Sequence, residues 1–526
     1  MRAQAVADVK DLSRSGFFDA DEKYLEIKSH LTSAQALAME ESTLEKWLET
    51  DGRELLRRLL QGHIDLRAGL ERDVGRADPI VGRDGVERTH ERSSERGLMT
   101  IFGPVRVPRI EHGGRGLTSL HPLDAELNLP ADSFSFCVRR RCAEEASKNS
   151  FDESTASVAS TTGALVAKRQ VEELTVRAAA DFEEFYAGRA AMPDHEISGD
   201  ILVISVDGKG VVMRHEDLRP ATKAAAEKGK HKLEHRLSKG EKGNRKRMAM
   251  VAAVYTIAAF IRSPEDIVRD LSAVRVPVPS RPKPEFKRVW ASLVKSPRKV
   301  VREAFEEALR RDPMRRRTWV ALSDGNKTQI KELRRAARKF GVKLVLVVDL
   351  IHVLEYLWKA TTAFNKEGTP EAERWVSERL LEVLRGKAGL VAGGIRRSAT
   401  RRGLSNEDRR SADACAKYLR KYKRLLRYDE FLARGLPIAT GVIEGACRHL
   451  IADRMDITGA RWRLLRAEAV LRLRALRSSG DFDEYWAFHQ AKERARNHTS
   501  RYAAEIIPPL RGSACKTGRN RLRLVN

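Results

Sequence analysis

The sequence predicts an α/β fold, with a sheet-containing core inside a largely helical chain of several domains. Four short, mostly apolar runs lie at 201–206, 248–257, 318–322 and 342–348. Most of the remaining chain repeats its apolar residues at helical spacing. The last two runs are separated by one helical stretch that ends before Gly341. A strand, a helix and a strand at this spacing predict two parallel strands joined by a right-handed crossover.

Length and composition restrict the class of protein. At about 150 residues per domain, 526 residues predict three or four folding units. With 42% hydrophobic and 33% charged residues, the chain is neither collagen-like nor wholly disordered. Lysine and arginine outnumber aspartate and glutamate 99 to 73, which gives a net charge of +26. This balance favours polyanionic partners, nucleic acid before an anionic membrane.

The location is expected to be the cytoplasm. The five cysteines form no CxxC pair, which argues against a disulfide framework and a zinc finger and favours a reducing compartment. Asp8 and Asp11 occupy the place where a signal peptide has its apolar run. The longest nearly apolar stretch, Met248 to Ile261, has 14 residues, whereas a membrane-spanning helix needs about 20.

Positive charge is concentrated in two blocks. Residues 219–247 hold eleven bases against three acids, and residues 395–427 hold twelve against three. One such block alone is often only a solvated face. Two blocks in an already basic chain indicate a surface that follows phosphates.

The N-terminal part is expected to be helical over 20–75, with a break at Asp51-Gly52. Residues 99–110 alternate between apolar and other residues on both sides of Gly103-Pro104, which predicts a short hairpin. Pro108 marks an edge strand of this hairpin. Helical patterns return over 133–188. Ser150 and Glu153 form a capping box at the start of one helix, and a turn at 160–163 leads into a second over 164–186. This pair is either a DNA-reading helix-turn-helix or an ordinary helical hairpin.

In the sheet region, the first strand is expected to end at Asp207-Gly208 and to resume at 211–213. Residues 284–311 are expected to be mostly helical and basic. Two further acids, Asp324 and Asp349, follow the last two strands. Ligands of open parallel sheets bind beyond the carboxyl ends of the strands, so the three acids can converge there. Each Asp-Gly alone is most often a turn, whereas a convergent cluster needs a cation, for which Mg²⁺ is suited.

A fourth acid, Glu444, lies in the first turn of a helix that Thr440 is expected to cap. The helix dipole favours an anion at this position. The alternative is a routine i,i+4 pair with Arg448 that only supports the helix.

Several motifs in a fixed order carry a family resemblance. They are VISVDGKGVVMR, RKRMAMVAAVYTI, LSDGNKTQ, LVVDLIHVLEYLWKA and LPIATGVIEGACRHLIADRMDITGARW. With these motifs the chain resembles the ISKra-type bacterial insertion-sequence transposases, which are related to Mutator-like transposases. The resemblance extends over residues 99–190 as well and is weakest in the first 90 residues.

The resemblance implies a ribonuclease H-like mixed sheet as the catalytic α/β core, with an Asp-Asp-Glu triad and a helical insertion before the glutamate. The implied catalytic and metal-binding residues are Asp207, Asp324 and Glu444. Asp324 is preferred over Asp349 as the second aspartate if strand 318–322 lies beside the first strand. Asp349 with His352 then resembles an auxiliary Asp-x-x-His motif. The implied cofactor is a pair of Mg²⁺ ions, which Mn²⁺ can replace.

The expected domains are a helical region (1–98), a hairpin with a helix-turn-helix-like DNA-binding region (99–195), the first part of the core (196–352), a helical insertion (353–436), and the completion of the core with a basic tail (437–526). Trp358 and Trp375 of the insertion are expected in its core, with stacking on unpaired bases as the alternative.

The implied activity is DNA transposition: cleavage by metal-activated water at the ends of the element, then joining of the 3′-hydroxyl to target DNA. The implied partners are double-stranded DNA, as terminal inverted repeats and target, and further copies of the chain in a dimer or larger assembly at the bacterial nucleoid. The alternatives are a structure-selective nuclease of the same fold and a transposase-derived DNA-binding protein without activity. The expected DNA-contacting residues are Lys228, Lys230, Lys232, Arg236, Arg245, Lys246, Arg247 and Arg448.

Overall fold

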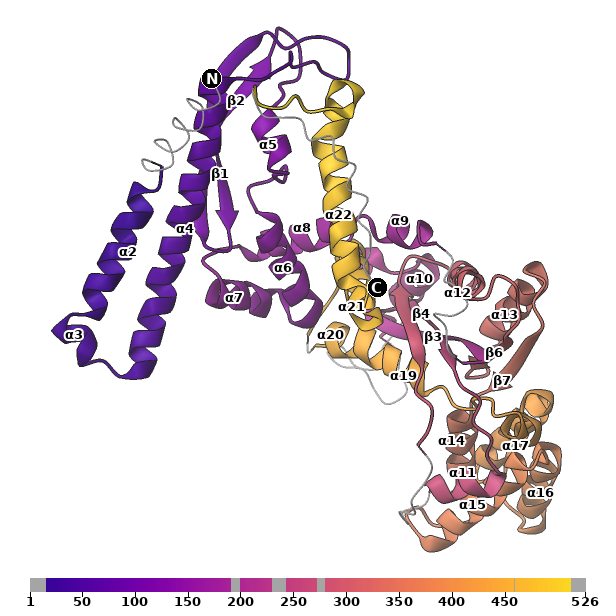
Figure 1. Ribbon diagram of the computed structural model, residues 1–526. Coiled ribbons are helices and arrows are strands. Elements are labelled where there is room, and N and C mark those ends of the chain that lie inside the picture. The colour runs from indigo at the N-terminus through magenta and orange to yellow at the C-terminus, as the bar shows by residue number, and fades with distance from the viewer. Residues whose placement is uncertain (1–15, 191–198, 229–242, 272–279, 458, 512–526) are drawn as a thin grey trace. The chain divides into compact units, whose positions relative to one another are not determined.

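The computed structural model describes residues 16–190, 199–228, 243–271, 280–457 and 459–511 (Figure 1). The chain forms two compact units. Unit 1 comprises Met1–Asp181 and Asp483–Asn526, and unit 2 comprises Phe182–Phe482. In the described part of the chain, no helix combines the length and the apolar character that crossing a bilayer requires.

Unit 1 begins with helices α2 (Phe18–Leu31), α3 (Ala34–Leu37) and α4 (Glu41–Val74). The predicted break at Asp51-Gly52 is wrong, because α4 continues through it. A glycine inside a helix costs about 1 kcal/mol relative to alanine. Here the contact between α2 and α4 offsets that cost, since Lys23 of α2 binds the Asp51 carboxylate at 2.6 Å.

A two-stranded ribbon packs against α4. Strands β1 (His90–Thr100) and β2 (Gly103–Gly113) pair antiparallel, with Thr100 opposite Gly103. The predicted hairpin is therefore present, but its strands are longer than expected and its turn is Ile101-Phe102. Apolar residues of both strands are buried against Ile64 of α4.

The rest of unit 1 is helical: α5 (Pro122–Glu126), α6 (Phe136–Lys148), α7 (Phe151–Thr161), α8 (Lys168–Ala178) and most of α22 (Phe482–Asn497). The predicted capping box of Ser150 and Glu153 starts α7. The predicted helix 164–186 is wrong in its bounds, because 162–167 is not helical and the helix is divided into α8 and α9 (Phe182–Ala187). In this non-helical segment Ala164 and Val166 are buried among residues of α6, α7 and α8.

Unit 2 contains a mixed five-stranded sheet. Its strands are β3 (Ile201–Val212), β4 (Lys246–Ile257), β5 (Glu285–Ser292), β6 (Thr318–Ser323) and β7 (Leu344–Val348). The order across the sheet is β5-β4-β3-β6-β7. β3 pairs antiparallel with β4 and parallel with β6, and β7 extends the parallel part. The parallel pair predicted for 318–322 and 342–348 is confirmed.

Two predictions for the sheet are wrong. β3 does not stop at Asp207-Gly208, because both residues remain paired with β4 after the pairing with β6 has ended at Ser205. Residues 285–292 form strand β5 instead of a helix. Val289, Trp290 and Ala291 of this strand are buried and the strand packs against α21, and such burial outweighs the helical spacing of the local sequence.

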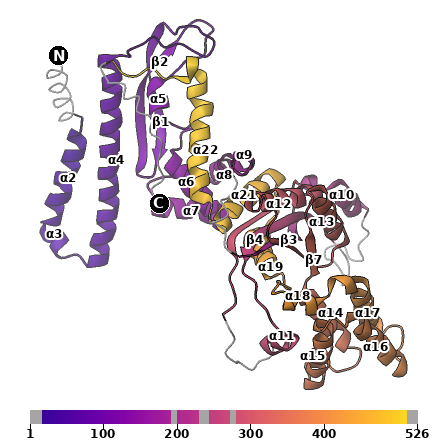
Figure 2. The same ribbon diagram turned by 45° about the vertical axis from the view of Figure 1, so that its right-hand side comes forward.

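The helices of unit 2 are α9, α10 (Pro220–Glu227), α11 (Pro264–Leu271), α12 (Pro297–Arg311), α13 (Lys327–Lys339), α14 (Leu350–Thr361), α15 (Pro370–Leu384), α16 (Ala388–Arg401), α17 (Arg410–Tyr422), α18 (Tyr428–Ala433), α19 (Gly441–Ala446), α20 (Asp453–Met455) and α21 (Leu464–Ser479). Every residue of β3 from Ile201 to Val206 is buried, so helices cover both faces of the sheet. α12, α13, α19 and α21 provide this cover. Helices α14–α17 form a separate group next to β7 (Figures 1 and 2).

Candidate active site

Three aspartates lie at matching positions on adjacent parallel strands. Asp207 and Asp324 each follow the last β3–β6 pair, Ser205 with Leu322, by two residues. Asp324 and Asp349 each follow the last β6–β7 pair by one residue. Neighbouring strands lie about 4.8 Å apart, so the three carboxylates occupy one edge of the sheet. This is the edge at which open α/β sheets bind their ligands.

Asp349 is fully buried, and both of its carboxylate oxygens accept hydrogen bonds. It caps the N-terminus of α14, where its Oδ2 accepts hydrogen bonds from the His352 backbone at 3.2 Å and pairs with His352 Nδ1 at 2.8 Å. Its Oδ1 accepts the backbone N–H of Thr440 at 2.8 Å. The hydrogen bond that His352 donates to Asp349 raises the pKa of His352, burial opposes this, and the negative charges of Asp349 and Asp324 add to the rise. Asp349 therefore connects the end of β7 to the segment that carries Glu444.

Asp324 is half-buried in the turn between β6 and α13. Its Oδ1 accepts the Asn326 N–H at 2.7 Å. With its amide turned to satisfy its neighbours, Gln329 donates to the same oxygen at 3.2 Å and to the Val206 carbonyl of β3 at 3.1 Å. Among the described residues, none donates a hydrogen bond to Oδ2 of Asp324. One oxygen of this carboxylate therefore remains available to a ligand.

The helical insertion holds the same turn through its tyrosines. The hydroxyl of Tyr418 donates to the Asp324 carbonyl at 3.2 Å, and that of Tyr422 donates to the Gly325 carbonyl. Gly325 has a φ of 92°, a conformation that favours glycine. Tyr428 likewise donates to the Val348 carbonyl at 2.6 Å, one residue before Asp349. Hydroxyl groups from α17 and α18 therefore fix the backbone at the ends of β6 and β7.

Glu444 lies in the first turn of α19 and is exposed. Thr440 is the N-cap residue, as predicted, but its hydroxyl donates to Glu444 Oε1 at 3.2 Å instead of capping the backbone. The alternative pair with Arg448 is not formed, because Arg448 approaches Asp453 at 3.8 Å. After α19 the chain forms a π-helical turn over Cys447–Ala452, a feature that often marks functional sites.

Asp207 faces the start of that π-helical turn. The Cys447 thiol donates to Asp207 Oδ2 at 3.4 Å, and the Gly208 N–H donates to Oδ1 at 2.6 Å. Burial raises the pKa of the Cys447 thiol, and the negative charges of Asp207 and Glu444 raise it further. The thiol is therefore protonated and serves as a hydrogen-bond donor to the carboxylate.

One group of these side chains has the spacing of a metal site. Ligand atoms of Asp349, His352 and Glu444 all lie within 4.8 Å of one another. The predicted set of Asp207, Asp324 and Glu444 does not meet this spacing in the described residues, although all three belong to the same edge of the sheet. The site as a whole could hold a divalent cation.

The predicted DNA-contacting residues have different surroundings. Lys228, Arg245, Lys246 and Arg448 are exposed. Arg247 is engaged with the protein, since it donates to the Asp217 and Leu293 carbonyls at 2.9 Å and burial lowers its pKa. The predicted contacts Lys230, Lys232 and Arg236 lie outside the described residues.

Sequence reasoning missed Cys447 and the three tyrosines as neighbours of the acids. No spacing in the sequence relates α17 to the turn at Asp324, because the two segments are far apart in the chain. Of the two insertion tryptophans, Trp375 is buried and stacks on Phe364, as expected for a core residue, whereas Trp358 is 42% exposed.

Comparisons with known proteins add little to this geometry. No protein-family model and no curated protein matches the sequence. Among solved structures, the chain is similar to the Drosophila P element transposase strand transfer complex, with 11% sequence identity and a TM-score of 0.22 over 69% of this chain and 82% of that chain. A likeness of this size establishes neither the fold nor the function.

Proposed function

We propose that this chain is a DNA transposase of the Asp-Asp-Glu class, with a ribonuclease H-like core and of the ISKra type that its motifs resemble. The alignment of Asp207 and Asp324, each two residues past the last pair of the parallel strands β3 and β6, carries the proposal, with Glu444 on a nearby helix. The strand order supports it, because β6 lies directly beside β3, as a second aspartate at Asp324 requires.

The donor chemistry fits the implied Mg²⁺. Asp207, Asp324 and Glu444 offer only carboxylate oxygens, the ligands that Mg²⁺ prefers, with Mn²⁺ as a substitute. Asp349 fits less well, because it is fully buried and one of its oxygens pairs with His352, whereas Asp207 is only partly buried. When bound, a pair of such ions activates the attacking water or 3′-hydroxyl and stabilises the leaving oxygen.

The protein's own groups position the three acids. Cys447 holds one oxygen of Asp207, and the tyrosines of α17 hold the turn of Asp324. Thr440 holds Glu444 while its own backbone N–H is fixed by Asp349. In this arrangement Asp349 and His352 are auxiliary: they orient the segment of the third acid.

DNA binding in this proposal involves both units. The exposed Lys228, Arg245, Lys246 and Arg448 of unit 2 would contact phosphates. In unit 1, helix α8 exposes Lys168, Arg169 and Arg177, and we propose that α6–α8 recognise the ends of the element. Joining two DNA ends calls for at least two copies of the chain.

The decisive experiment compares cleavage and joining of DNA from the flanks of the gene by the wild-type protein and four alanine variants. The variants are Asp207→Ala, Asp324→Ala, Asp349→Ala and Glu444→Ala, each first shown to bind the same DNA. The proposal expects Mg²⁺-dependent cleavage and joining by the wild type. It expects loss of both in the Asp207, Asp324 and Glu444 variants, and reduced activity in Asp349→Ala.

Other outcomes lead to defined alternatives. An inactive Asp349→Ala beside an active Asp324→Ala would make Asp349 the second catalytic aspartate. Cleavage without any joined product would favour the structure-selective nuclease. Binding of the flanking DNA without cleavage or joining would favour a DNA-binding protein derived from a transposase.

A further inference from the structure

A groove lined by positive charge runs between α13 and the end of α17. Its volume is about 660 Å³. The basic residues that line it are Lys327, Lys331, Arg334 and Arg338 of α13, and Arg420, Lys421, Lys423 and Arg424 at the end of α17 and in the following 3₁₀ turn (Lys423–Leu425). All eight are exposed, and no acidic residue lines the groove. We call it the α13–α17 groove.

The four basic residues on α13 form a single stripe. They recur at i, i+4, i+7 and i+11, which places them on one face of the helix. At 1.5 Å per residue the stripe is about 16 Å long. Since one DNA strand carries a phosphate about every 3.4 Å along the axis, the stripe spans roughly five phosphates.

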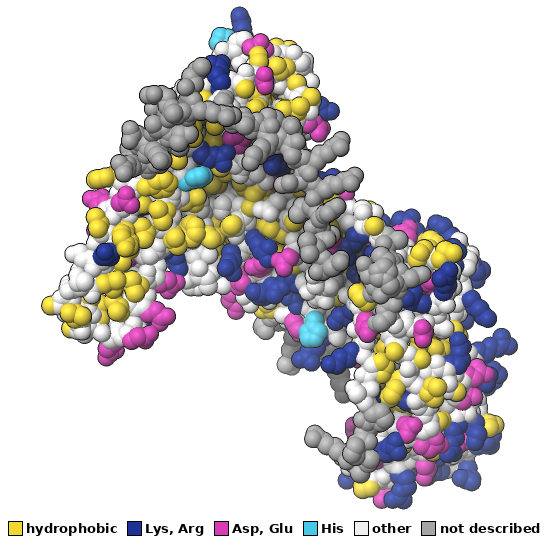
Figure 3. Space-filling model, viewed as in Figure 1, with side chains coloured by type: hydrophobic (Ala, Val, Ile, Leu, Met, Phe, Trp, Pro, Cys, Tyr) yellow, Lys and Arg dark blue, Asp and Glu magenta, His cyan; other side chains and the backbone are white. Residues whose placement is uncertain are grey.

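These charges are not neutralised by the protein. In the described part of the chain, none of the eight side chains forms an ion pair with a carboxylate. Lys421 instead contacts the Tyr422 ring at 4.1 Å. Figure 3 shows lysine and arginine side chains gathered along the edge of unit 2 where Figure 1 draws α13 and α17. Eight unpaired cations in one groove repel one another, and a polyanion relieves that repulsion.

The groove extends toward the edge strand of the sheet. A second hollow of about 660 Å³ shares Arg334, Arg338 and Arg424 with the first and has apolar walls that include Leu346 and Phe431. Tyr422 also lines the groove, and its hydroxyl donates to the Gly325 carbonyl beside Asp324. The groove therefore adjoins the turn of the candidate active site.

The lining favours contact with a DNA backbone over stacking on bases. Proteins that bind single strands present exposed aromatic rings to the bases. Here Tyr422 and Phe431, the aromatic residues that line the two hollows in the described residues, are each 6% exposed. Long, exposed basic side chains without an aromatic platform suit the phosphates of a duplex.

We propose that the α13–α17 groove binds the sugar-phosphate backbone of double-stranded DNA next to the reacting phosphate. This inference rests on the proposed function and extends it, because it assigns a role to the four basic residues at the end of α17, which belong to the second basic block. The helical insertion then has two roles: it holds the turn of Asp324 and it supplies half of the groove.

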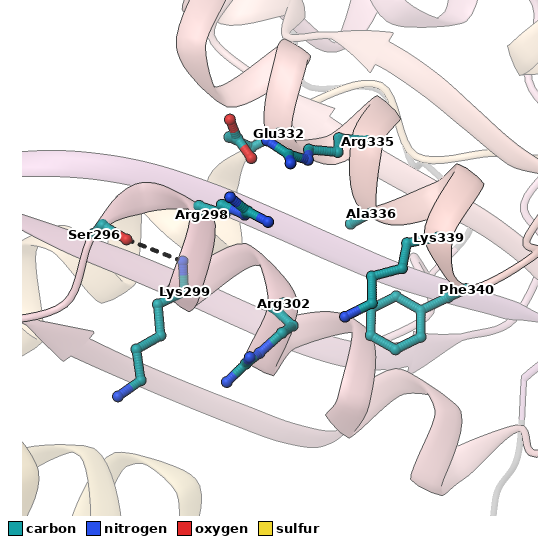
Figure 4. A pocket seen from close by; sticks show the side chains of 9 residues that line it. All are labelled: Ser296, Arg298, Lys299, Arg302, Glu332, Arg335, Ala336, Lys339 and Phe340. Atoms are coloured by element: carbon teal, nitrogen blue, oxygen red, sulfur yellow. Dashed lines mark hydrogen bonds between the residues drawn. The ribbon is translucent and has the colours of Figure 1, made fainter.

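The test compares two charge-matched triple variants of the full chain. The groove variant is Lys331→Gln/Arg334→Gln/Arg338→Gln. The control is Arg298→Gln/Lys299→Gln/Arg302→Gln, which removes the same charge from α12, where these residues line a separate cleft of about 240 Å³ that also contains Glu332 (Figure 4). Circular dichroism first establishes that both variants are folded like the wild type.

Binding is measured with a fluorescein-labelled DNA duplex and with one of its single strands, in EDTA, across a series of salt concentrations. For the groove variant we expect roughly a 10²-fold loss of duplex affinity near 0.1 M salt, and a salt slope reduced by about 2.7, since three phosphate contacts each contribute about 0.9. The control is expected to lose less than about threefold.

Three results would overturn the proposal: wild-type duplex binding by the groove variant, equal losses in both variants, or a loss confined to the single strand. Because EDTA removes divalent metal, the outcome does not depend on cleavage. Duplex binding through the groove can therefore be detected even if the protein neither cuts nor joins DNA. Conversely, a protein that is an active transposase can still fail this binding test.

Discussion

The Asp349 carboxylate accepts the backbone N–H of Thr440 at 2.8 Å, and the Thr440 hydroxyl donates to Glu444 at 3.2 Å. This chain of two hydrogen bonds links the end of β7 to the start of α19 across the whole helical insertion. Both partners of the first bond are buried, so the position of Glu444 is determined by the sheet although its own side chain is exposed.

The first prediction concerns this link. Thr440→Val keeps the backbone N–H but removes the hydroxyl, and we expect the single-turnover cleavage rate to fall about tenfold, the equivalent of one hydrogen bond of about 1.4 kcal/mol. Thr440→Ser retains the hydroxyl and is expected to cleave like the wild type. Equal rates for the two variants would show that Thr440 does not position Glu444.

The second prediction concerns the tyrosines of α17. The double variant Tyr418→Phe/Tyr422→Phe removes both hydroxyl groups that fix the turn of Asp324. We expect the Mg²⁺ concentration for half-maximal cleavage to rise about fivefold or more, since each lost hydrogen bond is worth about 1 kcal/mol. Tyr356→Phe is the control, because the Tyr356 ring stacks on Tyr418 at 4.1 Å and, among the described residues, its hydroxyl forms no hydrogen bond. A double variant that titrates with Mg²⁺ like this control would contradict the positioning role.

The third prediction concerns metal binding without catalysis. Mg²⁺ or Mn²⁺ is expected to stabilise the wild-type chain by about 1.4 kcal/mol at a free concentration tenfold above Kd. Differential scanning fluorimetry measures this as an increase in Tm. Asp207→Asn should abolish the increase, whereas Glu355→Gln, which removes an exposed charge on α14, should preserve it. A metal response that survives in Asp207→Asn would remove Asp207 from the ligand set.

The fourth prediction concerns a buried ion cluster that fixes α12 to the sheet. Glu307 binds Arg288 of β5 at 2.7 Å and also pairs with Arg310 and Arg311. Glu307→Gln leaves these guanidinium groups without their buried anion, and we expect a loss of about 3–5 kcal/mol in the free energy of unfolding. Urea unfolding followed by circular dichroism measures it, with Glu306→Gln as an exposed neighbour for comparison.

The same cluster predicts a pH dependence. Burial alone would raise the pKa of Glu307, but the positive charges of Arg288 and Arg311 outweigh it and hold the pKa well below 4.5. The stability from Glu307 is therefore fully present above pH 4.5 and is lost as the pH falls toward the lowered pKa. Below pH 4.5 the wild type should lose stability more steeply than Glu307→Gln. Parallel curves would indicate that Glu307 keeps an ordinary pKa.

Much of the sheet could be predicted from the sequence, because its buried strands are short apolar runs with clear ends. The parallel order of β6 and β7 followed from the single helix between them. β5 was not predictable in the same way, because only its second half is buried and its basic first half, with Phe286 and Lys287, resembles the helical stretch that follows. Its strand conformation depends on α21, which comes much later in the chain.

The acidic residues of the candidate site could be predicted from the sequence, but the side chains that hold them in position could not. Asp324 and Asp349 follow their strands, and Asp207 lies just past the parallel part of β3, so their shared edge follows from parallel topology. The hydrogen bonds of Tyr418, Tyr428 and Cys447 depend on how the insertion folds back, and no local pattern encodes that. The helix break expected at Asp51-Gly52 failed for a related reason, since the ion pair with Lys23 forms between two helices.

Unit 1 consists of two chain segments separated by all of unit 2. In unit 1 the late segment contributes Tyr485, which binds the Ala178 carbonyl, and His489, which pairs with Asp181 at 2.6 Å. During synthesis, the first segment therefore leaves the ribosome roughly 300 residues before its partner helix α22. Unit 2 can fold on the ribosome while unit 1 is still incomplete. The sheet of unit 2 is therefore expected to form before the second segment of unit 1 packs against the first.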